Sequence, residues 1–203
     1  QTENTVHEEL KTRYKPNRVF VIHRLDQGTS GVMLFARNQK SFENLKKQLE
    51  KRTMHREYVA IVKGIVEEKE GTWKSYLYED PSYQVRTTND PEEGEEAITH
   101  FKILASKNPF SVLHAKLETG KKNQIRVHCQ EAGIPILGDE RYGGDMKAAK
   151  RLMLHAFLLE FVHPSTGKKM SFNSSIPRSF TYFVSPTQWL HPPMTSEVKH
   201  GQP

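Results

Sequence analysis

The stretch that decides the fold runs from His23 to Gly31 and reads HRLDQGTSG. Two short apolar runs flank it, VFVI at 19–22 and VMLFA at 32–36, and their β-branched and aromatic residues predict buried strands. Arg24 and Asp26 therefore lie on a bend between strands. A charged group next to apolar strands is costly to desolvate unless it has a partner. Asp26 is thus either structurally paired or catalytic, since charged loop residues on a rigid scaffold often serve function.

The same stretch, as the pattern H-R-L-D-x-x-T-S-G, closely resembles the signature of the RluA-type pseudouridine synthases. These enzymes isomerise uridine in RNA to its C-glycoside. Three further stretches resemble the family in the same order, at 56–64, 118–139 and 154–174, so the resemblance covers about residues 18–180. It implies that Asp26 is the catalytic aspartate. It also implies that Arg24 occupies the gap left when the target base is extruded from the RNA.

Composition and charge agree with an RNA-binding protein. The chain has 203 residues, of which 35% are hydrophobic and 27% charged, enough for one sizeable core. The formal net charge of +6 suits a polyanion such as RNA. No apolar run is long enough to span a bilayer, and the N-terminus lacks the layout of a secretory signal. The single cysteine, Cys129, fits a reducing compartment, so we expect a cytoplasmic protein that does not bind membranes.

The second stretch, REYVAIVKG at 56–64, has the pattern of a strand that stops at Gly64. A tyrosine in a strand is ordinarily a core residue whose hydroxyl is satisfied. The resemblance instead places Tyr58 against the target base, and stacking on an aromatic ring stabilises a base by about 1–3 kcal/mol in single-strand binders. Arg56 stands where the family typically has a lysine, and it is a second candidate for substrate binding.

The third stretch, ETGKKNQIRVH at 118–128, predicts a short helix over 123–132 that stops at Gly133. Taken alone, Arg126 would be an exposed helix cation. The resemblance implies that Arg126 pairs with Asp26. An arginine within a few ångströms lowers the pKa of a buried carboxylate by about 1–3, which keeps it ionised.

Two neighbours of Arg126 complete this part of the predicted site. The resemblance places Ile125 beside the substrate. Asn123 stands where the family usually has a histidine, which keeps a hydrogen-bonding side chain and removes a titratable one.

The rest of the chain predicts an α+β (mixed α/β) fold, with a single catalytic domain on a largely antiparallel mixed sheet and short flanking helices. Four strand patterns with no helical crossovers between them predict an antiparallel meander, and they lie at 72–78, 84–88, 97–104 and 111–117. A helix capped by Ser41 is predicted over 41–51. We expect His155 and His163 to be structural. The expected organisation is a lead-in at 1–17, a catalytic domain at 18–185 and an irregular tail at 186–203 with Trp189 docked.

Pseudouridine formation breaks the N1–C1′ bond, rotates the uracil and reattaches it through C5. It needs no redox change, so we expect no cofactor and no metal. Asp26 must be ionised, either to attack C1′ or to remove a sugar proton, and both routes stay open. We expect His23 to shape the loop at the substrate, and Thr29 and Ser30 to cap backbone groups within it.

Two other classes of function compete with this hypothesis. One is a basic RNA-binding module or an inactive catalytic fragment, because family members usually carry more sequence before the first motif. The other is a metal-dependent nuclease using Asp139, Glu140 and Asp145, although this segment reads more simply as a turn. The expected substrate is ribosomal RNA of the large subunit, with transfer RNA as the alternative, and we expect a monomer.

Overall fold

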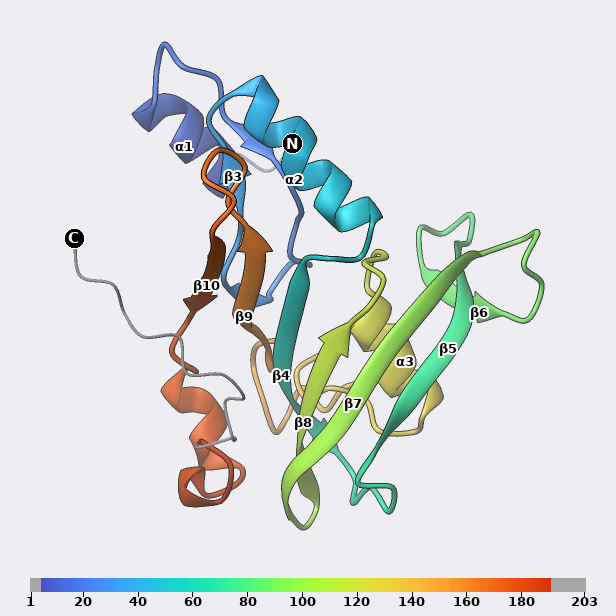
Figure 1. Ribbon diagram of the computed structural model, residues 1–203. Coiled ribbons are helices and arrows are strands. Elements are labelled where there is room, and N and C mark those ends of the chain that lie inside the picture. The colour runs from blue at the N-terminus through green and yellow to red at the C-terminus, as the bar shows by residue number, and fades with distance from the viewer. Residues whose placement is uncertain (1–4, 191–203) are drawn as a thin grey trace.

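An eight-stranded sheet is the centre of the computed structural model, which describes residues 5–190 (Figure 1). Seven strands follow the order β10-β9-β4-β8-β7-β5-β6, β2 pairs with β9 off this path, and β1 and β3 form a separate two-stranded sheet. The elements are α1 Val6–Arg13, β1 Phe20–Val21, β2 Ser30–Gly31, β3 Phe35–Ala36, α2 Gln39–Glu50, β4 His55–Lys63, β5 Glu70–Glu79, β6 Val85–Thr88, β7 Glu95–Lys107, β8 Phe110–Leu117, α3 Gln124–Glu131, β9 Leu154–Val162, β10 Lys169–Asn173, and the 3₁₀ turns η1 Arg178–Tyr182 and η2 Pro186–Gln188.

Strand β4 lies between β8 and β9, and its sequence explains this central place. Residues 58–62 are all buried, and most are β-branched or aromatic, as a strand covered on both faces requires. All strands on the main path pair antiparallel, whereas β2 pairs with β9 in parallel. The predicted fold class, a largely antiparallel mixed sheet with short helices, is confirmed.

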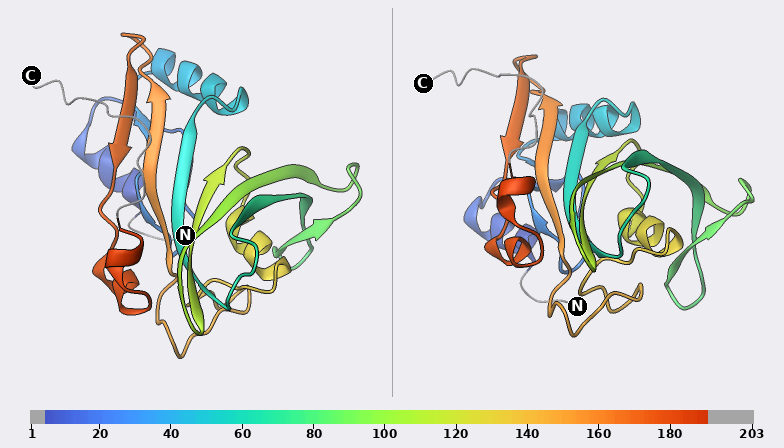
Figure 2. Two further views of the ribbon diagram at one scale, coloured as in Figure 1. Left: turned by 60° about the horizontal axis from the view of Figure 1, so that its bottom comes forward. Right: turned by 90° about the horizontal axis from the view of Figure 1, so that it is seen from below.

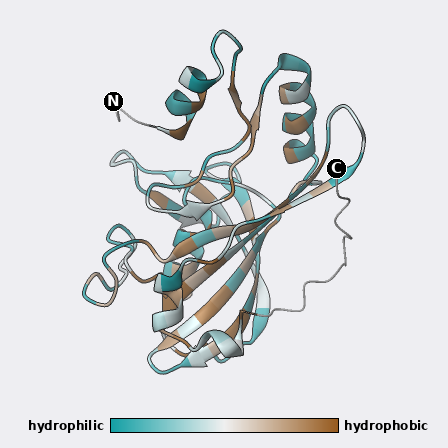
Figure 3. Cartoon of the chain, turned by 90° about the vertical axis from the view of Figure 1, so that its left-hand side faces the viewer, coloured by the Kyte–Doolittle hydropathy of each residue, from teal (hydrophilic) through white to brown (hydrophobic). Residues whose placement is uncertain are grey.

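The helices lie on different parts of the sheet. Figure 2 shows the curved part of the sheet, β5 to β8, beside α3, while α2 lies near the far ends of β4 and β9. The hydrophobic residues of α2 are confined to one side of the helix in Figure 3. Leu45 is buried there. Phe42 and Leu49 pack against the core cluster that contains Leu45, to which residues of β1 and β3 also contribute. None of the helices within residues 5–190 is long and apolar enough to cross a membrane.

Three details differ from the predictions. Helix α2 is capped by Asn38, whose side chain accepts from the Ser41 backbone N–H at 2.8 Å, so Ser41 is not the cap. The expected meander is wrong in its order, because β5 pairs with both β6 and β7 and leaves β6 at the edge. The lead-in contains helix α1, capped by Thr5; it has no buried residue, so no apolar periodicity marks it.

Other expectations are confirmed. Trp189 is 3% exposed, and its Nε1 donates to the carbonyl of Val184 at 3.2 Å. His163 accepts backbone N–H groups of its own turn, as a structural residue does. The rest of the predicted tail, residues 191–203, lies outside the described residues.

The HRLDQGTSG loop is fixed to the sheet at its C-terminal end. Ser30 and Gly31 form β2, which pairs with His155 and Ala156 of β9. The Ser30 hydroxyl lies 2.8 Å from His155 Nδ1, which confirms a structural role for that histidine. Gly31 has φ +120°, and a Cβ there would overlap the backbone of Ala156. Only glycine therefore lets the loop approach β9 this closely.

Replacing Gly31 with alanine tests this anchoring. Gly31→Ala should lower the free energy of unfolding by about 2–5 kcal/mol, from roughly 1–2 for the left-handed backbone and 1–3 for overpacking. Gly167→Ala is the matched control: Gly167 has φ +69° and open space around its Cβ position, so only the first cost applies. Urea denaturation of both variants measures the difference. Equal losses would show that the close approach to β9 does not constrain the loop.

Candidate active site

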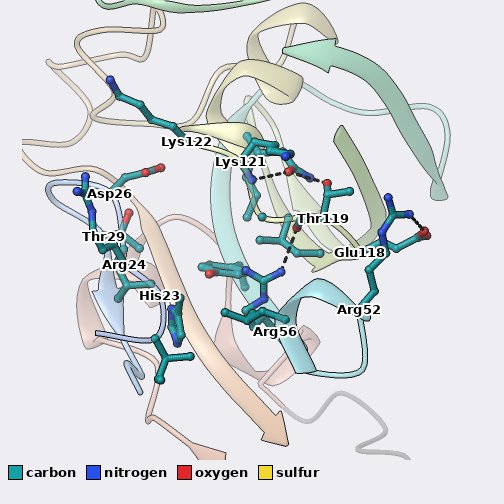
Figure 4. Close-up of a pocket in the computed structure, with 18 of the residues that line it drawn as sticks. His23, Arg24, Asp26, Thr29, Arg52, Arg56, Glu118, Thr119, Lys121 and Lys122 are labelled. Atoms are coloured by element: carbon teal, nitrogen blue, oxygen red, sulfur yellow. Dashed lines mark hydrogen bonds and ion pairs between the residues drawn. The ribbon is translucent and has the colours of Figure 1, made fainter. Parts of the chain in front are cut away.

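A cavity of about 790 Å³ opens beside the HRLDQGTSG loop (Figure 4). That loop forms one wall, β4 and the end of β8 form another, and the end of α2 and the segment leading into α3 also line the cavity. Basic side chains outnumber acidic ones in the lining: Arg24, Lys46, Arg52, Arg56, Lys121 and Lys122 against Asp26, Glu50 and Glu118. The cavity thus presents positive charge around a single loop aspartate, which suits an anionic ligand.

Asp26 is half-buried in the loop wall, and the backbone N–H of Asn123 donates to its Oδ1 at 3.3 Å. Burial raises the pKa of Asp26 above its ordinary 3.8, because the charged form loses hydration. The positive charge of Arg126 and the Asn123 N–H oppose this rise. The carboxylate is therefore poorly solvated, a state in which it is reactive.

Arg126 is buried, at 9% exposure, rather than exposed as its helix position alone would suggest. Its carboxylate partner is Asp139: Nε donates to Oδ2 and Nη2 donates to Oδ1, both at 2.7 Å. Within residues 5–190, Arg126 forms no ion pair with Asp26, so the expected direct pair is wrong. Arg126 does not line the cavity. Its positive charge nevertheless opposes the rise in the pKa of Asp26. Burial alone would lower the pKa of Arg126, but Asp139 raises it above its usual range.

Asn123 connects Arg126 to Asp26. Its Oδ1 accepts from Arg126 Nη1 at 2.8 Å, its Nδ2 donates to the Tyr142 hydroxyl at 3.1 Å, and its backbone N–H reaches Asp26. It adopts a left-handed conformation with φ 56°, which asparagine tolerates better than most residues. Sequence reasoning missed this role, although the Asn-for-His departure pointed to the position.

Tyr142 is a further site residue that sequence reasoning did not identify, and Asp139 was considered there only as a metal ligand of a nuclease. Both are 1% exposed, and the Tyr142 backbone N–H donates to Asp139 at 3.1 Å. The Arg126 guanidinium also lies over the Tyr142 ring, 4.8 Å from its centre. An acid in a Gly-Asp-Glu-Arg-Tyr-Gly turn carries no local signal for a buried partner, so only the tertiary fold reveals the pair.

Tyr58 lines the cavity and is 7% exposed. Burial raises its pKa to about 12, so the side chain is a neutral phenol at physiological pH. It sits next to an irregularity in the pairing of β4 with β9, between Glu57 and Tyr58, where a strand commonly re-aims a side chain. Tyr58 therefore contributes a neutral phenol to the cavity lining rather than a base.

Arg56 is 8% exposed and lines the same cavity. Its Nη2 donates to the Thr119 carbonyl at 3.2 Å, whereas its Nε is buried with no hydrogen-bond partner among the described residues. Burial lowers its pKa. His23 faces this region with both ring nitrogens buried and without a partner in residues 5–190. Burial, and then the charge of Arg56, lower the pKa of His23 to about 4, so it is neutral.

The remaining predicted residues also lie at the cavity. Arg24 is exposed at its rim, and Ile125 lines it while 4% exposed. Thr29 lines it too, but its buried hydroxyl has no partner within residues 5–190, and the Ser30 hydroxyl accepts from Arg151 at 2.9 Å. The expectation that Thr29 and Ser30 cap backbone groups of the loop is therefore wrong.

The acidic turn proposed for a nuclease does not gather into a ligand cluster. Asp139 accepts both bonds from Arg126, and Asp145 pairs with Lys63 at 3.0 Å. Within residues 5–190, no group of three or more His, Cys, Asp or Glu residues is placed to hold a metal ion. Asp139 instead serves the site as the counter-ion of Arg126.

Comparison with known proteins identifies the family of this chain. The family model described as RNA pseudouridylate synthase matches residues 2–131. The chain belongs to this family. The resemblance to the RluA-type pseudouridine synthases is thereby confirmed, and the matched residues include Asp26, Tyr58 and Arg126.

Individual relatives place the chain within the family. The uncharacterized RNA pseudouridine synthase YhcT of Bacillus subtilis is 40% identical over 169 residues, which cover 80% of this chain and 56% of the relative. Ribosomal large subunit pseudouridine synthase D of Neisseria meningitidis serogroup B is 36% identical over 180 residues, covering 83% and 48%. The chain thus spans about half the length of the curated relatives it matches.

A solved structure shares the fold. Human RNA pseudouridylate synthase domain containing 1 superposes with a TM-score of 0.72 at 24% identity, covering 84% of this chain and 74% of the human one.

Burial of Asp26 predicts a pH-dependent effect of Asp26→Asn on stability. A carboxyl whose folded pKa is raised contributes stability at low pH and loses it as pH rises through that pKa. Asparagine keeps the shape and the acceptor oxygen without the charge. Asp26→Asn should therefore match the parent near pH 3.5 and unfold at higher urea concentration near pH 7. A variant that is less stable than the parent at pH 7 would contradict the assignment of a poorly solvated carboxylate.

Proposed function

We propose that this chain isomerises specific uridines in RNA to pseudouridine, with Asp26 as the catalytic residue. The observation that carries the proposal is the placement of Asp26: a poorly solvated carboxylate in a cavity that is otherwise rich in basic side chains and that Tyr58 also lines. The cavity volume of about 790 Å³ accommodates a nucleotide. Family membership supports the same reaction.

The reaction assigns one task to each side chain. Asp26 either attacks C1′ or removes a sugar proton, and in both routes it must be ionised. Arg126 and the Asn123 N–H favour the ionised form, and Asp139 holds Arg126 in place. Tyr58 stacks against the target uracil, with Ile125 beside it.

Access to the base is the task of Arg24. A base in folded RNA must leave its stack, which costs a few kcal/mol. Arg24 is exposed at the cavity rim and has no carboxylate partner within residues 5–190. Its planar guanidinium can stack in the vacated position and bind a phosphate, which lysine does less well.

Ribosomal RNA of the large subunit is the substrate that we propose, with transfer RNA as the alternative. The name of the Neisseria meningitidis relative, ribosomal large subunit pseudouridine synthase D, supports this choice. We further propose that the protein is a monomer, and that it works in the cytoplasm because its single cysteine, Cys129, fits a reducing compartment.

The test is release of tritium from RNA labelled at uridine C5, because bonding C5 to C1′ displaces that hydrogen. The parent chain should release tritium to water from unmodified ribosomal RNA transcripts, and Asp26→Asn should release none. Gel-shift binding of the same RNA serves as the control that both proteins are competent to bind. RNA binding without release by the parent would favour a binding module, and release by Asp26→Asn would remove Asp26 from the mechanism.

A further inference from the structure

Arg56 is a buried cation without a counter-ion among the described residues 5–190. The other buried arginine, Arg126, has both oxygens of Asp139. Three further cations of the cavity are paired as well, Arg52 with Glu96 and Glu118, Lys121 with Glu95, and Lys122 with Glu79. Arg24 and Lys46 have no carboxylate partner within residues 5–190, but neither is buried. Arg56 alone in the cavity lining combines burial with a lack of any carboxylate within 4.0 Å in the described part of the chain.

An unpaired buried charge is destabilising, because burial removes its hydration and nothing replaces it. A protein can retain such a buried cation where an anionic ligand supplies the missing negative charge. The Arg56 guanidinium is also held in position: it lies against Gly120, where a Cβ would collide with it, and it donates to the Thr119 carbonyl. The structure therefore fixes a cation that is ready for an anionic ligand.

His23 adds a second unsatisfied group to the same place. Neither of its ring nitrogens has a hydrogen-bond partner within residues 5–190, although both are buried. His23 and Arg56 line the cavity together, and Figure 4 shows them on the same side of it. A neutral imidazole supplies one N–H donor, and such donors match the carbonyl oxygens of a pyrimidine.

From this arrangement, and resting on the proposed function, we infer that Arg56 and His23 bind the uracil ring oxygens and stabilise the uracil anion formed when the glycosidic bond breaks. When N1–C1′ breaks, its electron pair leaves with the uracil, whose negative charge spreads over N1, O2 and O4. C1′ becomes bonded to an Asp26 oxygen, or the sugar becomes unsaturated after Asp26 has taken a proton from it.

The second half of the reaction restores neutrality. C5 of the uracil anion bonds to C1′, Asp26 is released or returns its proton to the sugar, the C5 hydrogen leaves as a proton, and N1 takes up a proton. No oxidant or reductant is needed. The fixed cation encounters negative charge on the uracil only as the glycosidic bond breaks. It therefore stabilises the transition state more than the bound substrate, which is how preorganised charge accelerates a reaction.

A backbone phosphate is the other source of anionic oxygens, and the geometry favours uracil over it. Phosphates of a bound RNA lie along its backbone, where exposed cations such as Arg24 meet them. Arg56 is 8% exposed and two residues from Tyr58, which we place against the target base. The anion at Arg56 is therefore the base itself.

Equilibrium dialysis with free pyrimidines tests the inference without requiring turnover. The probes are uracil, which is neutral at pH 7.5, 5-nitrouracil, which is an anion there, and inorganic phosphate. The parent should bind 5-nitrouracil about tenfold or more tightly than uracil, as a charge-assisted hydrogen bond predicts. Arg56→Met should lose this preference. Arg52→Met is the matched control, because it removes a cation of the same cavity that already has two acidic partners, and it should keep the preference.

Gly120→Ala provides a second variant that keeps the charge and displaces the guanidinium. It should also weaken binding of 5-nitrouracil. Equal affinity of the parent for the two pyrimidines, or an undiminished preference in Arg56→Met, would overturn the inference. Binding of phosphate through Arg56 without binding of 5-nitrouracil would assign the site to RNA phosphate instead. Binding of free pyrimidines does not require turnover, so a failed tritium assay does not affect the dialysis result. Failure of the proposed function and failure of this inference are therefore distinguishable.

Discussion

The site depends on the buried ion pair between Arg126 and Asp139. Its two 2.7 Å bonds fix a guanidinium that would otherwise be free to turn, and the third nitrogen holds the Asn123 side chain. Asn123 in turn directs its backbone N–H at Asp26. Because both members of the pair are buried, loss of either one leaves an uncompensated charge, at a cost of about 3–5 kcal/mol. The hydrogen bond from Asn123 to Asp26, and part of the positive charge that acts on the Asp26 carboxylate, thus depend on one ion pair outside the cavity.

The two buried arginines of this site differ in whether a carboxylate neutralises their charge. Arg126 is neutralised by Asp139 and influences Asp26 only as one of several charges near it. Arg56 is left with a carbonyl and a tight glycine contact, so its charge is available to whatever enters the cavity. The proposed reaction, which releases a uracil anion, would use this asymmetry. In that proposal Arg126 favours the ionised form of Asp26, and Arg56 receives the charge that leaves with the uracil.

Local sequence patterns predict much of this fold and only part of this site. The strand at 56–64 follows from an apolar run bounded by Gly64, and the helix after Asn123 follows from its stop at Gly133. The position of β6 at the sheet edge is not predictable in this way, because pairing order depends on contacts between distant segments. The partner of Arg126 is missed for the same reason: Asp139 lies 13 residues away, beyond the end of α3, and a turn sequence does not show where its acid points.

We propose that the Arg126–Asp139 pair favours the ionised form of the half-buried Asp26. The most direct test is a ¹³C carboxyl titration of Asp26 in the parent and in Arg126→Leu/Asp139→Leu, which removes both charges and leaves neither buried alone; Asp26→Asn assigns the resonance. Because the attraction of Arg126 outweighs the repulsion of Asp139 at Asp26, we expect a higher pKa of Asp26 in the double variant. An unchanged or lower pKa would contradict it.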